Sequence, residues 1–244
     1  MPDALSRIET LSKTYDYFNG AKDILDNVTL VRGFARNAPK DIEGARKLLG
    51  IAENKYKPLK KFFNGTQKEV LAAITEGFPP IPDPSGEVKS RMEKIARAKG
   101  PNTPGFEKEL DLYLKQLKAY EYELRERLTY MDLVKKKCAL NEKNFQTMST
   151  VIQTTLAALK ALFVSTPSFR AATGGEILQI MEAGIEKQPA AISSAYRRLK
   201  TAAEKHETEI ARQHLRAKSA LKVAADKKLA FLMEDAKAFF KKLF

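Results

Sequence analysis

The fold of this chain is decided by residues 106–164, FEKELDLYLKQLKAYEYELRERLTYMDLVKKKCALNEKNFQTMSTVIQTTLAALKALFV, which contain neither proline nor glycine. A second stretch without either residue runs from Ala190 to Phe244. Inside a helix, proline costs about 3 kcal/mol and glycine about 1 kcal/mol relative to alanine. The two stretches therefore predict two very long helices, each extending over roughly 80–90 Å at about 1.5 Å per residue.

Apolar residues recur along the first stretch at spacings of three, four or seven, which keeps them on one face of a helix. They are Leu110, Leu114, Leu117, Leu124, Leu128, Met131, Cys138, Phe145, Met148, Ile152, Leu156, Leu159 and Phe163. The stripe shifts by one position near Glu121 and Lys135, which predicts gentle supercoiling or curvature rather than an ideal heptad repeat.

The second stretch carries a matching stripe that is rich in alanine. Its members are Ile192, Tyr196, Leu199, Ala203, His206, Ile210, Ala217, Leu221, Ala224 and Phe231. Small side chains let a partner helix approach closely, so we expect antiparallel packing of the second helix against the bulkier first one.

These patterns predict an all-α protein: an elongated helical bundle built on a long antiparallel, coiled-coil-like hairpin, with shorter N-terminal helices packed along it. We expect three parts. Residues 1–77 form short helices, residues 78–105 form a proline-rich connector with one charged helix at about 87–99, and residues 106–244 form the hairpin, with its tip at about 165–189.

Local signals mark the ends of the shorter segments. The Asn-Gly pair at 64–65 predicts a turn, and the Thr-x-x-Glu pattern at 66–69 predicts a capping box for a short helix that ends at Gly77. Thr103 followed by Pro104 predicts the start of the first long helix, because threonine caps helices and proline suits their first turn.

Composition limits the class of protein. The chain has 43 Lys and Arg against 30 Asp and Glu, a formal net charge of +13, which favours an acidic partner such as a phosphate backbone, an anionic lipid or an acidic protein. Its one cysteine, Cys138, excludes an intrachain disulfide and fits a reducing compartment. The start of the chain lacks the apolar core of a signal peptide, and no stretch reaches about 20 apolar residues. We expect a cytoplasmic or peripheral membrane protein.

Catalytic and metal-binding patterns are absent from the sequence. His206 and His214 are two helical turns apart, about 12 Å along a helix, which is too far for one metal ion to bridge. No glycine-rich phosphate loop of the Walker or Rossmann type occurs, and the acidic residues alternate with basic ones as on a solvated helix surface. The sequence thus predicts no enzyme activity, no cofactor and no metal.

Basic residues and the aromatic residues beside them are the candidate contacts for an anionic membrane or an acidic protein partner. The set is Lys57, Lys60, Lys61, Lys135, Lys136, Lys137, Arg197, Arg198, Lys227, Lys228, Lys237, Phe239, Phe240, Lys241, Lys242 and Phe244. Its C-terminal members follow the pattern of interfacial helices, in which lysines meet headgroups and aromatic rings enter the acyl boundary. The alternative is that these phenylalanines pack as ordinary core.

A basic chain built from long, curved helices without a catalytic motif resembles, in architecture, the BAR-type membrane-curvature scaffolds. The leading hypothesis is a non-enzymatic binding or scaffolding protein at an anionic membrane surface, acting as a homodimer. One alternative is a helical pore-forming or membrane-inserting toxin component, because residues 148–185 form an apolar tip that either inserts or is buried. The others are nucleic-acid binding and a structural subunit of a larger assembly.

Overall fold

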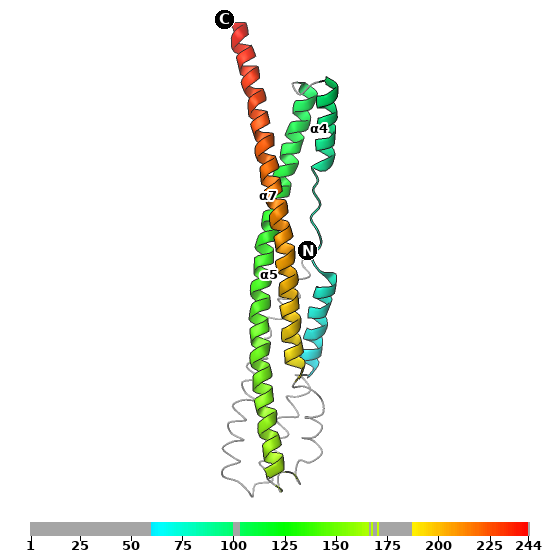
Figure 1. Cartoon of the computed structure of the whole chain (residues 1–244), viewed down its shortest axis with the longest axis vertical. Helices are drawn as coiled ribbons and strands as arrows, with labels where there is room; N and C mark the ends of the chain where they lie inside the picture. The colour runs from blue at the N-terminus through cyan, green and yellow to red at the C-terminus, as the bar shows by residue number, and fades with distance from the viewer. Residues whose placement is uncertain (1–59, 100–102, 166, 168–169, 171–186, 244) are drawn as a thin grey trace. The chain divides into compact units, whose positions relative to one another are not determined.

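The computed structural model describes residues 60–99, 103–165, 167, 170 and 187–243, and within these ranges it contains helices and no strand. Residues 60–76 form one helix. The other three are α4 (Gly86–Lys99), α5 (Pro104–Ser165) and α7 (Gln188–Leu243), drawn in Figure 1. The predicted charged helix and both predicted long helices are confirmed, with ends that differ by one or two residues. Most of the predicted tip at about 165–189 lies outside the described residues.

The start of α5 follows the predicted capping chemistry. The Oγ1 atom of Thr103 lies 3.4 Å from the backbone nitrogen of Phe106, and the Thr103 carbonyl accepts hydrogen bonds from the backbone of Phe106 and Glu107. Pro104 occupies the first helical position, where its missing N–H costs nothing. From there α5 continues for 62 residues without a proline or an internal glycine beyond its first turn.

Buried residues along α5 alternate at spacings of four and three without interruption. They are Phe106, Leu110, Tyr113, Leu117, Tyr120, Leu124, Arg127, Met131, Val134, Cys138, Asn141, Phe145, Met148 and Ile152. Ser149, next to Met148, is also buried. The predicted shift of the stripe near Glu121 and Lys135 is therefore wrong, because Tyr120 and Val134 continue the alternation.

Two residues of the predicted α5 stripe lie at the edge of the buried register, where Leu114 still packs against the core. Leu114 and Leu128 are only half-buried, whereas the neighbouring Tyr113 and Arg127 are buried. Hydrophobicity alone predicts that the leucines are the buried residues. A long amphipathic side chain, however, can bury its apolar stem between packed helices and keep its polar end satisfied. The guanidinium of Arg127 lies 5.9 Å from the centre of the Tyr130 ring, within reach of a cation–π contact.

Residues 60–76 form one helix that passes straight through the predicted turn at 64–65. The side chain of Asn64 accepts a hydrogen bond from Gln188 Nε2 at 3.1 Å, and Phe63 just before it is fully buried. These contacts outweigh the roughly 1 kcal/mol that a helical glycine costs relative to alanine. The predicted end of the helix is confirmed, because Gly77 has φ of +61°, the left-handed conformation common just past a helix.

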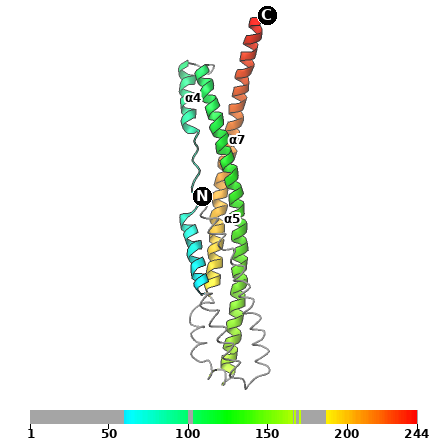
Figure 2. The same ribbon diagram turned by 180° about the vertical axis from the view of Figure 1, so that it is seen from behind.

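The chain divides into two compact units, and both long helices contribute to each. The first unit comprises Met1–Gly77 and Val134–Ala202. Both views show residues 60–76 beside the first turns of α7 (Figures 1 and 2). The aromatic core of this unit joins three segments. The centroid of the Phe145 ring on α5 lies 6.3 Å from that of Phe63 and 5.8 Å from that of Tyr196 on α7.

The second unit comprises Phe78–Leu133 and Ala203–Phe244. Here α4 packs beside the start of α5 (Figure 2). One buried cluster joins α4, α5 and α7: Val88, Met92, Phe106, Leu110, Tyr113, Leu117 and Ala224. Glu121 pairs with His214 and Glu107 with Lys228, so α5 and α7 run antiparallel within this unit.

The predicted stripe of α7 is confirmed. All ten of its residues are buried or half-buried, and they lie at intervals of three, four or seven. In the second unit, alanines at positions 203, 217 and 224 occupy buried positions.

Candidate interaction surface

The first predicted basic cluster is divided by the structure. Lys57 lies outside the described residues, while Lys60 and Lys61 are exposed at the start of the 60–76 helix. The phenylalanines that follow them belong to the core of the first unit, since Phe63 is fully buried and the ring of Phe62 stacks 6.2 Å from Phe145. Among the described members of this cluster, Lys60 and Lys61 are the exposed ones.

The cluster at 135–137 and the pair at 197–198 lie on the surface of the same unit. Lys136 is exposed, Lys135 and Lys137 are half-buried, and all three interact with neighbouring groups. Both arginines are exposed, and Arg197 forms an ion pair between its Nε and Glu142 Oε1 at 2.7 Å, which offsets its charge.

The adjacent lysines of α7 in the second unit have different surroundings. Lys228 is half-buried and its Nζ pairs with Glu107 and, at 3.2 Å, with Asp111. The hydrogen bond to Glu107 is the main reason that the pKa of Lys228 is raised. Lys227 is exposed and forms no ion pair with any carboxylate in the described part of the chain.

The C-terminal basic-aromatic segment belongs to the last turns of α7 and the residue after it. Lys237, Phe239, Phe240, Lys241 and Lys242 fall within α7, but their side chains are outside the described residues, and so is Phe244. Their role at a membrane stays a prediction.

A face that the sequence analysis missed lies on α7 in the second unit. Leu215, Leu229 and Met233 are 64%, 58% and 54% exposed. Basic side chains share this face, and one acidic residue lies among them. We call this surface the outer face of α7: Arg212, Leu215, Lys218, Lys222, Asp226, Leu229 and Met233, all exposed.

The sequence contains the spacing that defines this face. The face can be identified only when the buried positions of α7 are known. Ile210, Ala217 and Ala224 are buried at intervals of seven. The positions five residues after each of them, 215, 222 and 229, lie about 140° away around the helix, on the side opposite the core. Until the buried stripe is known, exposed leucines in a long helix cannot be told from core leucines.

Two ionisable side chains inside the units, His214 and Cys138, are surrounded by packed neighbours. His214 Nε2 and Glu121 Oε1 lie 2.7 Å apart. Burial raises the pKa of the Cys138 thiol to about 12, so the thiol stays protonated at neutral pH. No cluster of histidine, cysteine and acidic side chains within the described ranges could hold a metal ion.

Comparisons with known protein families, with curated proteins and with solved structures found no match to this chain. Among the described helices, none has a stretch both long and apolar enough to cross a bilayer. The assignment of function therefore depends on the surface chemistry of the chain itself.

Proposed function

We propose that this chain is a non-enzymatic protein that binds an anionic membrane surface through the outer face of α7. The observation that carries the proposal is the exposure of Leu215, Leu229 and Met233 on the same helical face as Lys218 and Lys222. Helices that lie in a membrane interface combine these two features, since apolar side chains enter the acyl boundary while lysines and arginines meet anionic headgroups.

The free energies expected from apolar and basic contacts together favour binding to an anionic membrane. A leucine moved fully from water to an apolar environment contributes about 1.5–3 kcal/mol, and a basic residue near an anionic leaflet contributes about 1 kcal/mol. The outer face supplies three such apolar side chains together with Lys218 and Lys222, against the carboxylate of Asp226, while Arg212 is already paired with Glu209 at 3.5 Å. Partial immersion of this face is enough for reversible peripheral binding.

Nucleic-acid binding is the closest competitor, because phosphates also attract the basic residues. It gives no reason for Leu215 and Leu229 to be exposed among those residues, since phosphate contacts are made by polar and charged groups. Membrane binding accounts for both kinds of side chain.

The proposal is tested by sedimentation with phosphatidylcholine vesicles that contain or lack phosphatidylserine. We expect binding to the anionic vesicles only. The double variant Lys218→Glu, Lys222→Glu should lower the partition coefficient at least about tenfold, since it replaces attraction with repulsion. The variant Leu229→Ser, Met233→Ser should also weaken binding, which a purely electrostatic contact would not show.

The matched control is Lys94→Glu, Arg97→Glu, which reverses two exposed charges on α4 and changes the net charge equally. We expect it to retain most of the binding. Equal losses in the two charge-reversal variants would mean that only net charge matters and would refute an assigned face.

We further propose that α5 and α7 pair along their full lengths as one antiparallel coiled-coil hairpin and that the protein acts as a homodimeric scaffold. The uninterrupted three-four alternation of buried residues in α5 is the repeat of coiled coils. Sedimentation equilibrium tests the dimer, and a monomer at concentrations where vesicle binding saturates would rule it out.

A further inference from the structure

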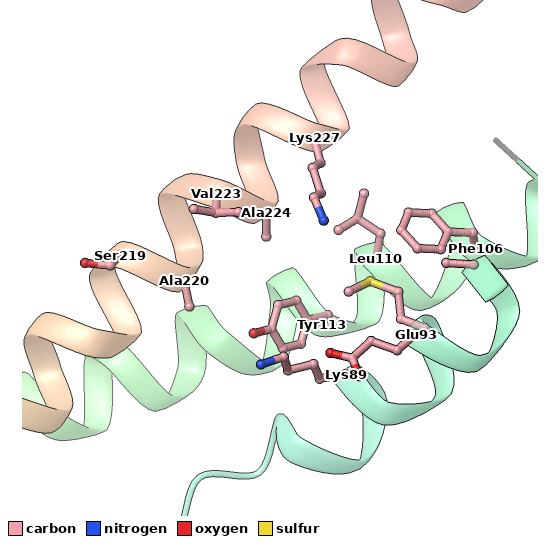
Figure 3. A pocket seen from close by; sticks show the side chains of 12 residues that line it. Lys89, Glu93, Phe106, Leu110, Tyr113, Ser219, Ala220, Val223, Ala224 and Lys227 are labelled. Atoms are coloured by element: carbon pink, nitrogen blue, oxygen red, sulfur yellow. The ribbon is translucent and has the colours of Figure 1, made fainter. Parts of the chain in front are cut away.

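A groove in the second unit lies between three helices and is distinct from the outer face of α7. Its volume is about 410 Å³, within the range of roughly 300–1,000 Å³ typical of small-molecule sites. Figure 3 shows side chains from α4, α5 and α7 around it. The large apolar residues that line it are Met92 from α4 and Phe106, Leu110 and Tyr113 from α5.

The groove exists because the α7 side carries small residues. Ala220 and Ala224 face side chains of much greater volume (Figure 3), and α4 adds Ala96. Leucines at the α7 positions would fill the space, as close packing in a helical core normally requires. The floor of the groove is packed core, since Phe106, Leu110 and Ala224 are all buried.

Charges are confined to three side chains that line this apolar groove. Lys89 and Glu93 on α4 are one helical turn apart, a spacing at which opposite charges offset each other. Lys227 reaches toward the groove from α7 (Figure 3) and forms no ion pair with a described carboxylate. One positive charge is therefore left beside an apolar trough.

We propose that this groove binds a monomeric long-chain fatty acid, with its hydrocarbon chain lying over Met92, Tyr113 and Ala220 and its carboxylate at Lys227. The apolar lining suits the hydrocarbon, and the unpaired ammonium suits the anionic head, because a charge-assisted hydrogen bond forms between them. Peptide ligands suit the groove less, since their backbone groups would find few polar partners along its apolar lining.

The test is calorimetric titration of the full chain with oleate, below its micelle concentration, and with oleyl alcohol, which has the same hydrocarbon chain without the charge. We expect oleate to bind about tenfold more tightly than the alcohol, the contribution of one charge-assisted hydrogen bond. Equal affinities, or no binding of oleate, would overturn the proposal.

Two charge variants have opposite expected effects. Lys227→Gln should weaken oleate binding about tenfold, whereas Glu93→Gln should strengthen it by removing a repulsive carboxylate. Neither should change the affinity for oleyl alcohol. If either side chain had only a structural role, its variant would change the affinities for oleate and oleyl alcohol together. A change in the affinity for oleate alone therefore identifies the effect of charge.

Ala220→Leu fills the groove without removing a contact, and we expect it to abolish binding of both ligands. The control is Ala225→Leu, at an exposed position of the same helix. Unchanged oleate binding in Ala220→Leu, with helix content intact by circular dichroism, would place the ligand elsewhere and refute the site.

The proposed fatty-acid site and the proposed membrane-binding face can be refuted separately. Ala220→Leu leaves the outer face of α7 intact and should bind anionic vesicles as the parent chain does. Lys218→Glu, Lys222→Glu changes no groove residue and should bind oleate normally. A chain that binds oleate but not vesicles would refute only the proposed function, and the reverse result would refute only the groove.

Discussion

At the scale of single residues, His206 shows how the seam sets the chemistry of a side chain. Its ring stacks on Phe78 with centroids 5.4 Å apart. Burial lowers its pKa, and the positive charge of Arg127 lowers it further, while Glu209 acts in the opposite direction. The folded chain therefore favours the neutral imidazole.

This environment predicts a pH dependence of stability. The unfolded imidazole has a pKa of about 6.5 and takes up protons more readily than the folded one, so stability is lost as pH falls below about 6.5. We expect urea denaturation to show a larger loss of stability between neutral and mildly acidic pH for the parent chain than for His206→Gln. Identical pH profiles would contradict the assigned environment.

Phe145 is the residue on which the aromatic core of the first unit depends, because it contacts Phe62, Phe63 and Tyr196. Phe145→Ala should lower the free energy of unfolding by about 3–5 kcal/mol, the cost of a buried aromatic cavity. Leu140→Ala, also on α5 but 59% exposed, is the control and should change stability by less than about 0.5 kcal/mol. Denaturant titration measures both, and similar losses would mean that the buried register of α5 is wrong.

At the scale of elements, α5 shows how far periodicity predicts a helix. The absence of proline and glycine predicted its extent, and Thr103 with Pro104 predicted its start. The buried register was harder, because Arg127 and Asn141 hold core positions that hydrophobicity would not select. Such polar seam residues can specify the register of paired helices, at a cost in stability.

The pairing of the long helices can be tested by cross-linking in a Cys138→Ser background. Glu121→Cys with His214→Cys should join α5 to α7 in the second unit, and Glu142→Cys with Arg197→Cys should do so in the first, because each pair is in side-chain contact. We expect a short bismaleimide to link both pairs within one chain. As a control, Glu121→Cys with Lys228→Cys should stay unlinked, since Lys228 pairs with Glu107, which lies about four turns from Glu121 along α5.

At the scale of the whole molecule, the formal net charge of +13 acts over distance. A net charge of this size raises the rate of encounter with any acidic surface, and salt screens it. Some basic residues are already paired internally, such as Lys228 with Glu107 and Arg197 with Glu142. If the chain binds an anionic membrane as proposed, the contact is expected to depend on the exposed basic residues that lie beside apolar ones.

The presence of exposed basic charge predicts how salt affects binding to anionic vesicles. Raising NaCl from about 0.1 M to about 1 M shortens the Debye length from about 10 Å to about 3 Å. We expect binding to anionic vesicles to fall at least about tenfold over this range, as attraction worth a few basic contacts is lost. Salt-independent binding would contradict the proposal. Tighter binding to duplex DNA than to vesicles at every salt concentration would favour nucleic acid as the partner.

The sequence by itself determined the helical class, the extents of the two long helices and the alanine-rich stripe of α7, because helix breakers and apolar periodicity act locally along the chain. Only the tertiary structure decided which side chains remain exposed. It made Phe63 core, carried a helix through Gly65, and left Leu215 and Leu229 on an outer face. It also created the groove, whose wall of small residues on α7 becomes a cavity only opposite the bulky residues of α4 and α5. The physical reason is that burial depends on which partner surfaces meet, and a pattern within one helix does not contain that information.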